Sequence, residues 1–244
     1  MIDLTSLNGN ETEDDIVKLC ESSGSCYGST AAVCVYPQFV RLAKSHLTKI
    51  GKSNIAVATV VNFPSGQEPI EKIIKDTELA IAHGADEIDI VLPYQSLLAG
   101  DVQQAEMILK ACKNVCANNA VLKVIIESGV LESAEHIRRA CEVCFSVGVE
   151  FIKTSTGKVK VNATPSAALE ILQSIKASGT NTGIKVSGGV KNLDEAAEYL
   201  SLAQQVMGDS WIDSRHFRFG ASSLLSTVID YLQQHSRTDN QAVT

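Results

Sequence analysis

Short apolar runs rich in valine and isoleucine alternate along this chain with longer stretches in which apolar residues recur every three to four positions. The short runs have the length and composition of buried β-strands, and the longer stretches have the period of amphipathic helices. The eight predicted strands comprise residues 2–5, 31–35, 55–61, 87–92, 121–126, 151–154, 183–186 and 217–220. The clearest helical patterns comprise residues 68–83, 101–119, 133–147, 164–178 and 194–207.

Several residues at the predicted helix boundaries have the preferences expected there. Ser133 can cap the start of one helix, and either Asn192 or Asp194 can cap another. Pro165 stands where the first turn of a helix tolerates proline. Glycines favour the position after a helix end, and three of them occupy such positions, namely Gly84, Gly148 and Gly179.

Eight strand–helix units in a chain of 244 residues predict an α/β fold, a single-domain (β/α)8 barrel of the TIM type. A doubly wound open sheet shares the alternation, but it usually has about five or six strands. No linker rich in serine, proline or glycine divides the chain. We therefore expect one domain over residues 1–235, followed by a polar, flexible tail over residues 236–244.

Three predicted strands carry charged residues near their C-terminal ends, where an apolar run is expected. They are Asp89, Lys153 and Lys185. A buried charge is costly unless it is paired, hydrated or used, and barrel enzymes place catalytic groups at these strand ends. The competing interpretation is an internal ion-pair network without chemistry, in which Lys123 with Glu127 would form a structural set.

Two lysines in a poorly solvated pocket suit one kind of chemistry. Repulsion from a second cation and loss of solvation both lower the pKa of a lysine, which then becomes a neutral amine nucleophile. Such an amine forms a Schiff base with a carbonyl substrate. Adjacent strands would place Lys153 and Lys185 at the same level, and we expect Asp89 to interact with Lys153 mainly through water.

Glycine- and serine-rich loops follow the last two predicted strands, at residues 187–191 and 220–223. Loops in these two positions often bind phosphate in such barrels, because glycine lets backbone N–H groups approach the anion and serine adds hydroxyl donors. Residues 156–158, just after Lys153, offer a further donor group, although they do not form a Walker P-loop. Tight turns with a helix cap are the structural alternative.

Composition narrows the class of protein and its setting. The 21 basic and 28 acidic residues give a net charge of −7, without the basic surplus typical of a nucleic-acid binder. No apolar run approaches the ~20 residues of a membrane span, and no secretory signal pattern is present. Seven irregularly spaced cysteines favour reduced thiols in a cytoplasm. Cys141 and Cys144 lie on a predicted helix, where buried packing is favoured over redox chemistry.

Seven segments together resemble the 2-deoxyribose-5-phosphate aldolase family, and the match runs in order over nearly the whole chain. Phe-Ile-Lys-Thr-Ser-Thr-Gly-Lys (151–158) with Lys-Val-Ser-Gly-Gly-Val (185–190) is highly specific for that family. The other segments are Val-Cys-Val-Tyr-Pro (33–37), Asn-Phe-Pro-Ser-Gly (62–66), Gly-Ala-Asp-Glu-Ile-Asp-Ile-Val-Leu-Pro-Tyr (84–94), Lys-Val-Ile-Ile-Glu (123–127) and Arg-Phe-Gly-Ala-Ser-Ser (218–223).

This resemblance implies a metal-free class I aldolase without a cofactor, which reversibly cleaves 2-deoxy-D-ribose 5-phosphate into acetaldehyde and D-glyceraldehyde 3-phosphate in deoxyribonucleotide catabolism. It makes Lys153 the Schiff-base nucleophile, Lys185 the lysine that lowers its pKa and relays protons, and Asp89 the proton carrier with an ordered water. Cys34 and Thr156 would line the pocket. The phosphate would be held by Gly157, Lys158, Gly188, Gly189, Gly220, Ser222 and Ser223.

The chain departs from the family pattern at three places, one of which is the start of the sequence almost directly at the first strand, without the short leader of some members. Lys191 stands where many relatives have arginine, which weakens bidentate phosphate contact, and the C-terminal residues lack the tyrosine that assists proton transfer in some members. We expect a cytoplasmic homodimer or higher homo-oligomer that binds sugar phosphate and aldehyde substrates, and neither nucleic acid nor membrane.

Two rival functions follow from the same residues. A Schiff-base barrel of the transaldolase type would differ in its donor, a dihydroxyacetone-type ketose in place of acetaldehyde. A sugar-phosphate sensor would use the lysines only as salt-bridge partners, and borohydride with acetaldehyde would not inactivate it.

Overall fold

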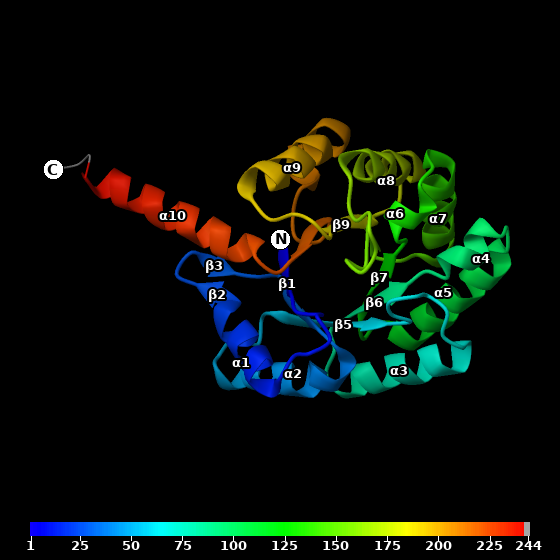
Figure 1. The fold of residues 1–244 in the computed structure, drawn as a ribbon, viewed down its shortest axis with the longest axis horizontal. Helices are drawn as coiled ribbons and strands as arrows, with labels where there is room; N and C mark the ends of the chain where they lie inside the picture. Colours follow the sequence, from blue (N-terminus) through cyan, green and yellow to red (C-terminus); the bar gives the residue numbers. More distant parts are fainter. Residues whose placement is uncertain (242–244) are drawn as a thin grey trace.

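The computed structural model describes residues 1–241, and the side chains of residues 1–236, as one closed barrel of parallel strands surrounded by helices (Figure 1). β1 pairs in parallel with both β10 and β4, so the sheet has no free edge. The order around the barrel is β1-β10-β9-β8-β7-β6-β5-β4. These strands are β1 (Ile2–Thr5), β4 (Ala32–Val35), β5 (Ala56–Val61), β6 (Glu87–Val91), β7 (Val121–Ile125), β8 (Phe151–Lys153), β9 (Gly183–Ser187) and β10 (Phe217–Ala221).

Each barrel strand is followed in the sequence by at least one α-helix, as the pattern predicts. The principal helices are α1 (Glu13–Ser22), α2 (Val40–Lys49), α3 (Ile70–Ala82), α5 (Val102–Cys116), α7 (Ala134–Val147), α8 (Pro165–Ser178), α9 (Leu193–Met207) and α10 (Leu224–Gln241). Smaller elements are the hairpin β2 (Gly24–Ser25) and β3 (Gly28–Ser29), helices α4 (Tyr94–Leu98) and α6 (Ser128–Leu131), and 3-10 turns at Pro37–Phe39 and Asp209–Trp211.

Closure of the sheet confirms the (β/α)8 barrel and rules out the open doubly wound alternative. Most predicted strand ends lie within one residue of the observed ones. β9 and β10 each continue one residue further than predicted, because Ser187 pairs in register with Gly220 and Ala221 pairs with Leu4 on β1. The helix predicted from residue 68 begins at Ile70, since Pro69 occupies its N-cap.

The predicted helix caps are also found. The side chains of Ser133 and Asn192 accept hydrogen bonds from backbone N–H groups at the starts of α7 and α9, so Asn192 and not Asp194 is the cap. Gly148 and Gly179 end α7 and α8 in the left-handed conformation, and Pro165 is the first residue of α8.

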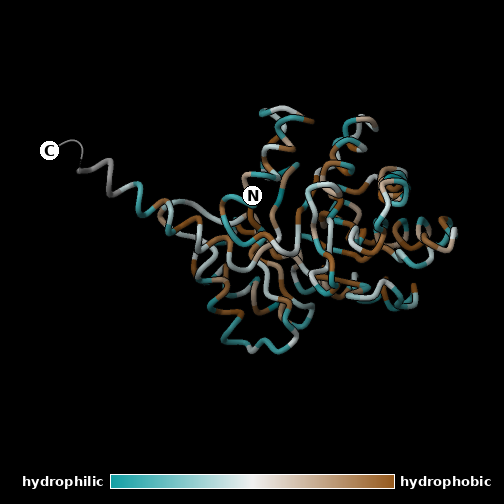
Figure 2. The backbone as a smooth tube through the Cα atoms, turned by 45° about the horizontal axis from the view of Figure 1, so that its top comes forward, coloured by the Kyte–Doolittle hydropathy of each residue, from teal (hydrophilic) through white to brown (hydrophobic). Residues whose placement is uncertain are grey.

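Helix α10 differs from the other principal helices in its direction. Figures 1 and 2 show it pointing away from the barrel, whereas the others lie around the strands. It runs through the segment predicted to be a tail from Ser236 and continues to Gln241. Residues 242–244 of that predicted tail lie outside the described residues. No helix within residues 1–241 is long and apolar enough to cross a membrane.

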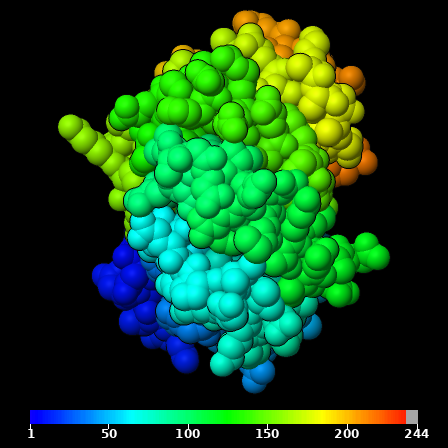
Figure 3. Space-filling model, turned by 90° about the vertical axis from the view of Figure 1, so that its right-hand side faces the viewer, coloured from blue at the N-terminus to red at the C-terminus, as the bar shows by residue number. Residues whose placement is uncertain are grey.

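The core has two parts, separated by the barrel wall. The large cluster fills the space between strands and helices, and the alternation of hydrophilic and hydrophobic residues along the helices is visible in Figure 2. Segments from the middle of the chain, cyan to green, form a continuous layer on the side shown in Figure 3. A small cluster inside the barrel contains Leu7, Ala32, Cys34, Ala58 and Val60. The interior also holds a cluster of buried charged side chains, which forms the candidate site.

Candidate active site

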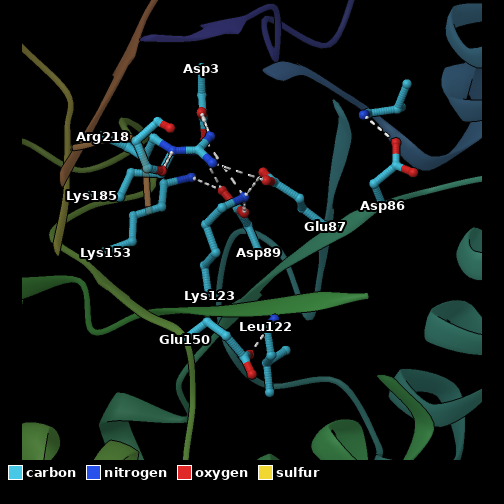
Figure 4. A network of polar contacts seen from close by, with 12 residues as sticks. Asp3, Asp86, Glu87, Asp89, Leu122, Lys123, Glu150, Lys153, Lys185 and Arg218 are labelled. Carbon is cyan, nitrogen blue, oxygen red and sulfur yellow. Dashed lines mark hydrogen bonds and ion pairs between the residues drawn. The ribbon is translucent and has the colours of Figure 1, made fainter. Parts of the chain in front are cut away.

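The barrel interior holds a cluster of buried charged side chains contributed by strands far apart in the sequence (Figure 4). Lys153 on β8 pairs in register with Lys185 on β9, as the sequence predicts. Asp89 on β6 pairs in register with Lys123 on β7. Lys123 is in register with Phe151, two residues before Lys153, so the two pairs are offset along the strands, and their side chains meet at Asp89.

Asp89 lies at the centre of this cluster. Its Oδ2 atom accepts hydrogen bonds from Lys153 Nζ at 2.9 Å and from Lys185 Nζ at 2.8 Å. Its Oδ1 atom accepts one from Lys123 Nζ at 2.8 Å. The prediction that Asp89 interacts with Lys153 mainly through water is therefore wrong. With no solvent exposure, Asp89 stays ionised because the Nζ atoms of three lysines contact it directly.

A second set of charged side chains contacts the first set, and sequence reasoning missed most of its members. Asp3 Oδ2 accepts a hydrogen bond from Lys185 Nζ at 2.7 Å, and Asp3 Oδ1 accepts one from Arg218 Nη1 at 2.7 Å. Glu87 contacts Lys123 at 2.5 Å and Arg218 at 3.4 Å. Asp3, Glu87 and Arg218 all lie inside apolar strands, so the signal that identified Asp89 could have identified them too.

The cluster contains three carboxylates and four basic groups, so full ionisation would leave one uncompensated positive charge in the barrel. The contacts indicate which basic group gives up its proton. Lys185 contacts two carboxylates, and Lys123 lies within 4 Å of three. Lys153 contacts only Asp89. Lys153 is therefore the amine that loses its proton most easily.

The pKa directions agree with this assignment. Burial, opposed by Asp89 and reinforced by the charge of Lys185, lowers the pKa of Lys153 from 10.5. Burial also disfavours the charged form of Lys185, but the Asp3 and Asp89 carboxylates outweigh it and hold the pKa of Lys185 well above its usual range. Despite its burial, the pKa of Asp89 is held well below 3.8 by Lys123, Lys153 and Lys185.

Lys153 is accessible from a pocket of about 210 Å³ at the C-terminal end of the barrel. All seven predicted phosphate-binding residues and Thr156 line this pocket. Lys191 also lines it, and with Lys158 it makes the wall basic. Gly188 and Gly189 have φ values of 84° and 96°, which other residues rarely adopt. The wall residues outside the predicted loops and residues are Thr5, Leu7 and Asn8.

The loop after β8 is held by a buried carboxylate, Glu127, at the end of β7. Its Oε1 accepts a hydrogen bond from Ser155 Oγ at 2.7 Å, and its Oε2 accepts one from Thr156 Oγ1 at 2.5 Å. The Thr156 hydroxyl in turn accepts from the backbone N–H of Lys158 at 3.0 Å. Glu127 thus fixes a wall of the pocket. The prediction of a Lys123–Glu127 pair is wrong, since Lys123 contacts Asp3, Glu87 and Asp89 instead.

Cys34 is fully buried on β4 and does not line the pocket wall, contrary to the prediction. Its pKa is raised, mainly by burial, so it is a thiol that packs inside the barrel. All seven cysteines are free, and six are buried, Cys141 and Cys144 among them, as predicted for packing residues. Among the described residues, no three His, Cys, Asp or Glu side chains form a group suited to a metal ion.

Several solved structures are similar to this chain over nearly all of its length. An aldolase described as QR15 shares 28% identity with this chain at a TM-score of 0.80, covering 96% of this chain and 95% of its own. A Toxoplasma gondii protein, provisionally assigned as a deoxyribose-phosphate aldolase, has 24% identity and a TM-score of 0.86, covering 94% and 91%. The tetrameric deoxyribose phosphate aldolase of Aeropyrum pernix has 22% identity and a TM-score of 0.77, covering 95% and 89%. The latter two show the shared fold.

The family model for the DeoC/LacD family aldolases matches residues 1–228, which include every barrel strand and every residue of the pocket wall. The chain belongs to the DeoC/LacD family of aldolases.

Proposed function

We propose that this aldolase is a class I enzyme that reversibly cleaves 2-deoxy-D-ribose 5-phosphate into acetaldehyde and D-glyceraldehyde 3-phosphate. One observation carries the proposal: the lysine with the lowered pKa, Lys153, lies in the same pocket as basic, glycine-rich loops suited to a phosphate. A small aldehyde with a phosphate at its far end fits both parts. The three Lys–Asp89 contacts and the family membership support the same reaction class.

In the cleavage direction, neutral Lys153 attacks the C1 aldehyde, and loss of water gives an iminium ion. The positive nitrogen withdraws electrons from the C2–C3 bond. As the C3 hydroxyl loses its proton, this bond breaks, glyceraldehyde 3-phosphate leaves, and the two remaining carbons form an enamine on Lys153. Protonation at C2 followed by hydrolysis releases acetaldehyde and restores the amine. The water released at the start is consumed at the end, so the reaction balances.

Asp89 and Lys185 have roles in the proton transfers of this scheme. We assign the proton removed from the C3 hydroxyl and returned to C2 to Asp89 acting with a water molecule. Lys185 holds Asp89 ionised and shares its Oδ2 atom with Lys153, so it can pass protons to the same carboxylate. Its retained positive charge also favours the neutral form of Lys153.

The phosphate end of the substrate is assigned to the loops around residues 157–158, 188–191 and 220–223. Backbone N–H groups at the glycines, the hydroxyls of Ser222 and Ser223, and the charges of Lys158 and Lys191 would hold it there. Ser222 and Ser223 directly precede α10, and a helix start favours a negative charge.

The decisive experiment traps the Schiff base. Incubation with acetaldehyde and sodium borohydride should abolish activity and add one ethyl group to Lys153, identified by peptide mass mapping. A Lys153→Met variant should neither take up the label nor cleave the substrate. An ethyl group on another lysine, with Lys153 unmodified, would refute the assignment. Labelling by dihydroxyacetone in place of acetaldehyde would indicate a transaldolase-type enzyme.

Metal independence remains a prediction of the class I mechanism, since the imine takes the role that a Lewis acid has in other aldolases. Exhaustive treatment with EDTA should leave the cleavage rate unchanged. Loss of activity that zinc restores would contradict the class I assignment.

A homo-oligomer, a cytoplasmic location and a role in deoxyribonucleotide catabolism are further parts of the proposal. The tetrameric Aeropyrum pernix relative supports the first, and seven free cysteines support a reducing compartment. Light scattering on the purified chain at several concentrations would measure the oligomeric state directly.

A further inference from the structure

The hydroxyl of Ser187 is a buried polar group without a partner on the wall of the active-site pocket. The side chain is 5% exposed, and its Oγ atom has no hydrogen-bond partner among the described side chains and backbone. A buried hydroxyl without a partner lowers the free energy of unfolding of the protein. Such a group in a binding pocket therefore points to a ligand that supplies the missing partner.

The backbone around Ser187 fixes the position of this hydroxyl. Ser187 N–H donates to Thr154 Oγ1 at 2.9 Å, and Thr154 Oγ1 donates to the Ser187 carbonyl at 3.1 Å. Ser187 pairs in register with Gly220 on β10. A Cβ atom at Gly220 would lie 2.3 Å from Ser187 Oγ, so the Ser187 side chain occupies the space that the absence of a side chain at Gly220 leaves open.

Ser187 lies between the two ends of the proposed substrate site. It follows Lys185 by two residues, so both side chains point to the same side of β9, about 6.6 Å apart along the strand. It directly precedes Gly188 and Gly189, which line the phosphate end of the pocket. A substrate with its first carbon at Lys153 and its phosphate at this loop must present its middle carbons to Ser187.

We propose that Ser187 is a specificity-determining residue that hydrogen-bonds the C4 hydroxyl of the substrate, which is the 2-hydroxyl of glyceraldehyde 3-phosphate. This inference rests on the proposed function. The C4 hydroxyl is chosen because C4 adjoins the carbon that carries the phosphate, and Ser187 adjoins the phosphate loop. The hydroxyl can both donate to and accept from a substrate hydroxyl. A site built to pair with a hydroxyl discriminates against the analogue that lacks it.

The test measures the synthesis direction, with acetaldehyde as donor and two acceptors. D-Glyceraldehyde 3-phosphate carries the 2-hydroxyl, and 3-oxopropyl phosphate lacks it. The Ser187→Ala variant should lose about tenfold in kcat/KM for the first acceptor and remain close to wild type for the second. Trapping of the acetaldehyde imine on Lys153 should proceed at the wild-type rate, because that step precedes acceptor binding.

Ser128 provides a matched control. Its Oγ atom is also buried without a partner, but it lies in a separate pocket between α6, α7 and α8. The Ser128→Ala variant should leave the ratio of the two acceptors unchanged. Both alanine variants should be at least as stable to heat as the wild type, since each removes an unsatisfied hydroxyl.

The outcomes separate this inference from the proposed function. If wild-type protein forms the imine and uses both acceptors, but Ser187→Ala loses activity equally on both or on neither, the role of Ser187 is refuted alone. If the wild type forms no imine with acetaldehyde, the proposed function fails and the inference fails with it.

Discussion

The reactivity of Lys153 depends on its having fewer carboxylate contacts than its neighbours. Lys123 and Lys185 each have at least two acidic partners, whereas Lys153 has one that it shares. Burial without sufficient compensation lowers the pKa of an amine, and the positive charge of Lys185 adds to that effect. The cluster thus keeps its other lysines charged and leaves one amine available as a nucleophile.

A Lys185→Met variant should show this dependence directly. Removal of the cation leaves Asp89 with a larger net influence on Lys153, so the pKa of Lys153 should rise and the neutral amine should form only at higher pH. Activity at neutral pH should fall by at least about tenfold and recover in part under alkaline conditions. The measurement is the rate of borohydride-trapped imine formation between pH 6 and about pH 10.

Lys160→Met is the control for this series, because Lys160 is an exposed lysine in the segment after β8 and does not line the pocket. Its profile should match the wild type. If a folded Lys185→Met variant keeps the wild-type pH profile, Lys185 is not the perturbing charge.

At the level of residues, the local sequence pattern was enough to predict several of the charged residues that form the site. It was not enough to predict which of them contact one another, because that depends on how the strands are arranged around the barrel. A charge in an apolar run identified Asp89, Lys153 and Lys185. The direct contact between Asp89 and Lys153 could not be predicted, because it joins strands that are not neighbours in the barrel. The orphaned hydroxyl of Ser187 is likewise defined only by which atoms surround it.

At the level of elements, the loop after β8 depends on Glu127 at the end of the preceding strand, β7. Glu127→Gln should keep the size of this side chain but leave fewer acceptors for the Ser155 and Thr156 donors. We expect the loop to loosen, the KM for deoxyribose 5-phosphate to rise several-fold, and the free energy of unfolding to fall by about 1–3 kcal/mol.

Steady-state kinetics and urea unfolding would measure both effects, and Glu132→Gln on the neighbouring exposed segment serves as control. A fall in kcat with no change in KM would contradict a role in holding the substrate-binding loop.

The loop before α10 makes a separate prediction about the phosphate. Ser222→Asp places a negative charge on the pocket wall, where the phosphate is proposed to bind. The KM for deoxyribose 5-phosphate should rise at least about tenfold, since like charges at short range repel by more than 1 kcal/mol. Cleavage of unphosphorylated deoxyribose should change much less. Equal losses on both substrates would indicate a general disturbance of the fold rather than a phosphate site.

Most element boundaries could be predicted to within a residue or two because caps and apolar runs are local signals, as at Ser133 and Pro165, whereas α5 ends at Cys116, three residues before its predicted end. The direction of α10 could not be predicted. Its apolar positions show that the helix is amphipathic, but they do not show where the helix points relative to the barrel. The anchoring of residues 155–156 by Glu127 has no local signal either, since the partners lie 28 and 29 residues apart.

At the level of the whole molecule, barrel closure is what completes the charged cluster. Asp3 in the first strand and Arg218 in the last are 215 residues apart, and they meet because β1 pairs with β10. The cluster is therefore a property of the closed fold, and folding must bring all of its charges out of water together. That cost is lowest when one basic group, Lys153, carries no proton.

This reasoning predicts that the proposed nucleophile destabilises the folded protein in a pH-dependent way. Because the pKa of Lys153 is lower in the folded chain than its ordinary value of 10.5, the folded state binds fewer protons at this site than the unfolded state. The penalty is full below the folded-state pKa, shrinks as the pH rises above it, and vanishes above the unfolded-state pKa. Lys153→Met removes the penalty, while Asp89 keeps its contacts with Lys123 and Lys185.

Lys153→Met should therefore be inactive yet more stable than the wild type, by about 1–3 kcal/mol near neutral pH. The difference should narrow as the pH approaches about 10, because the unfolded chain then also loses the proton. Urea unfolding at a series of pH values between about 5 and 10 measures it, and Lys160→Met should show no such trend. A difference that is constant with pH, or a Lys153→Met variant less stable than the wild type, would mean that Lys153 is charged in the folded protein and compensated by Asp89.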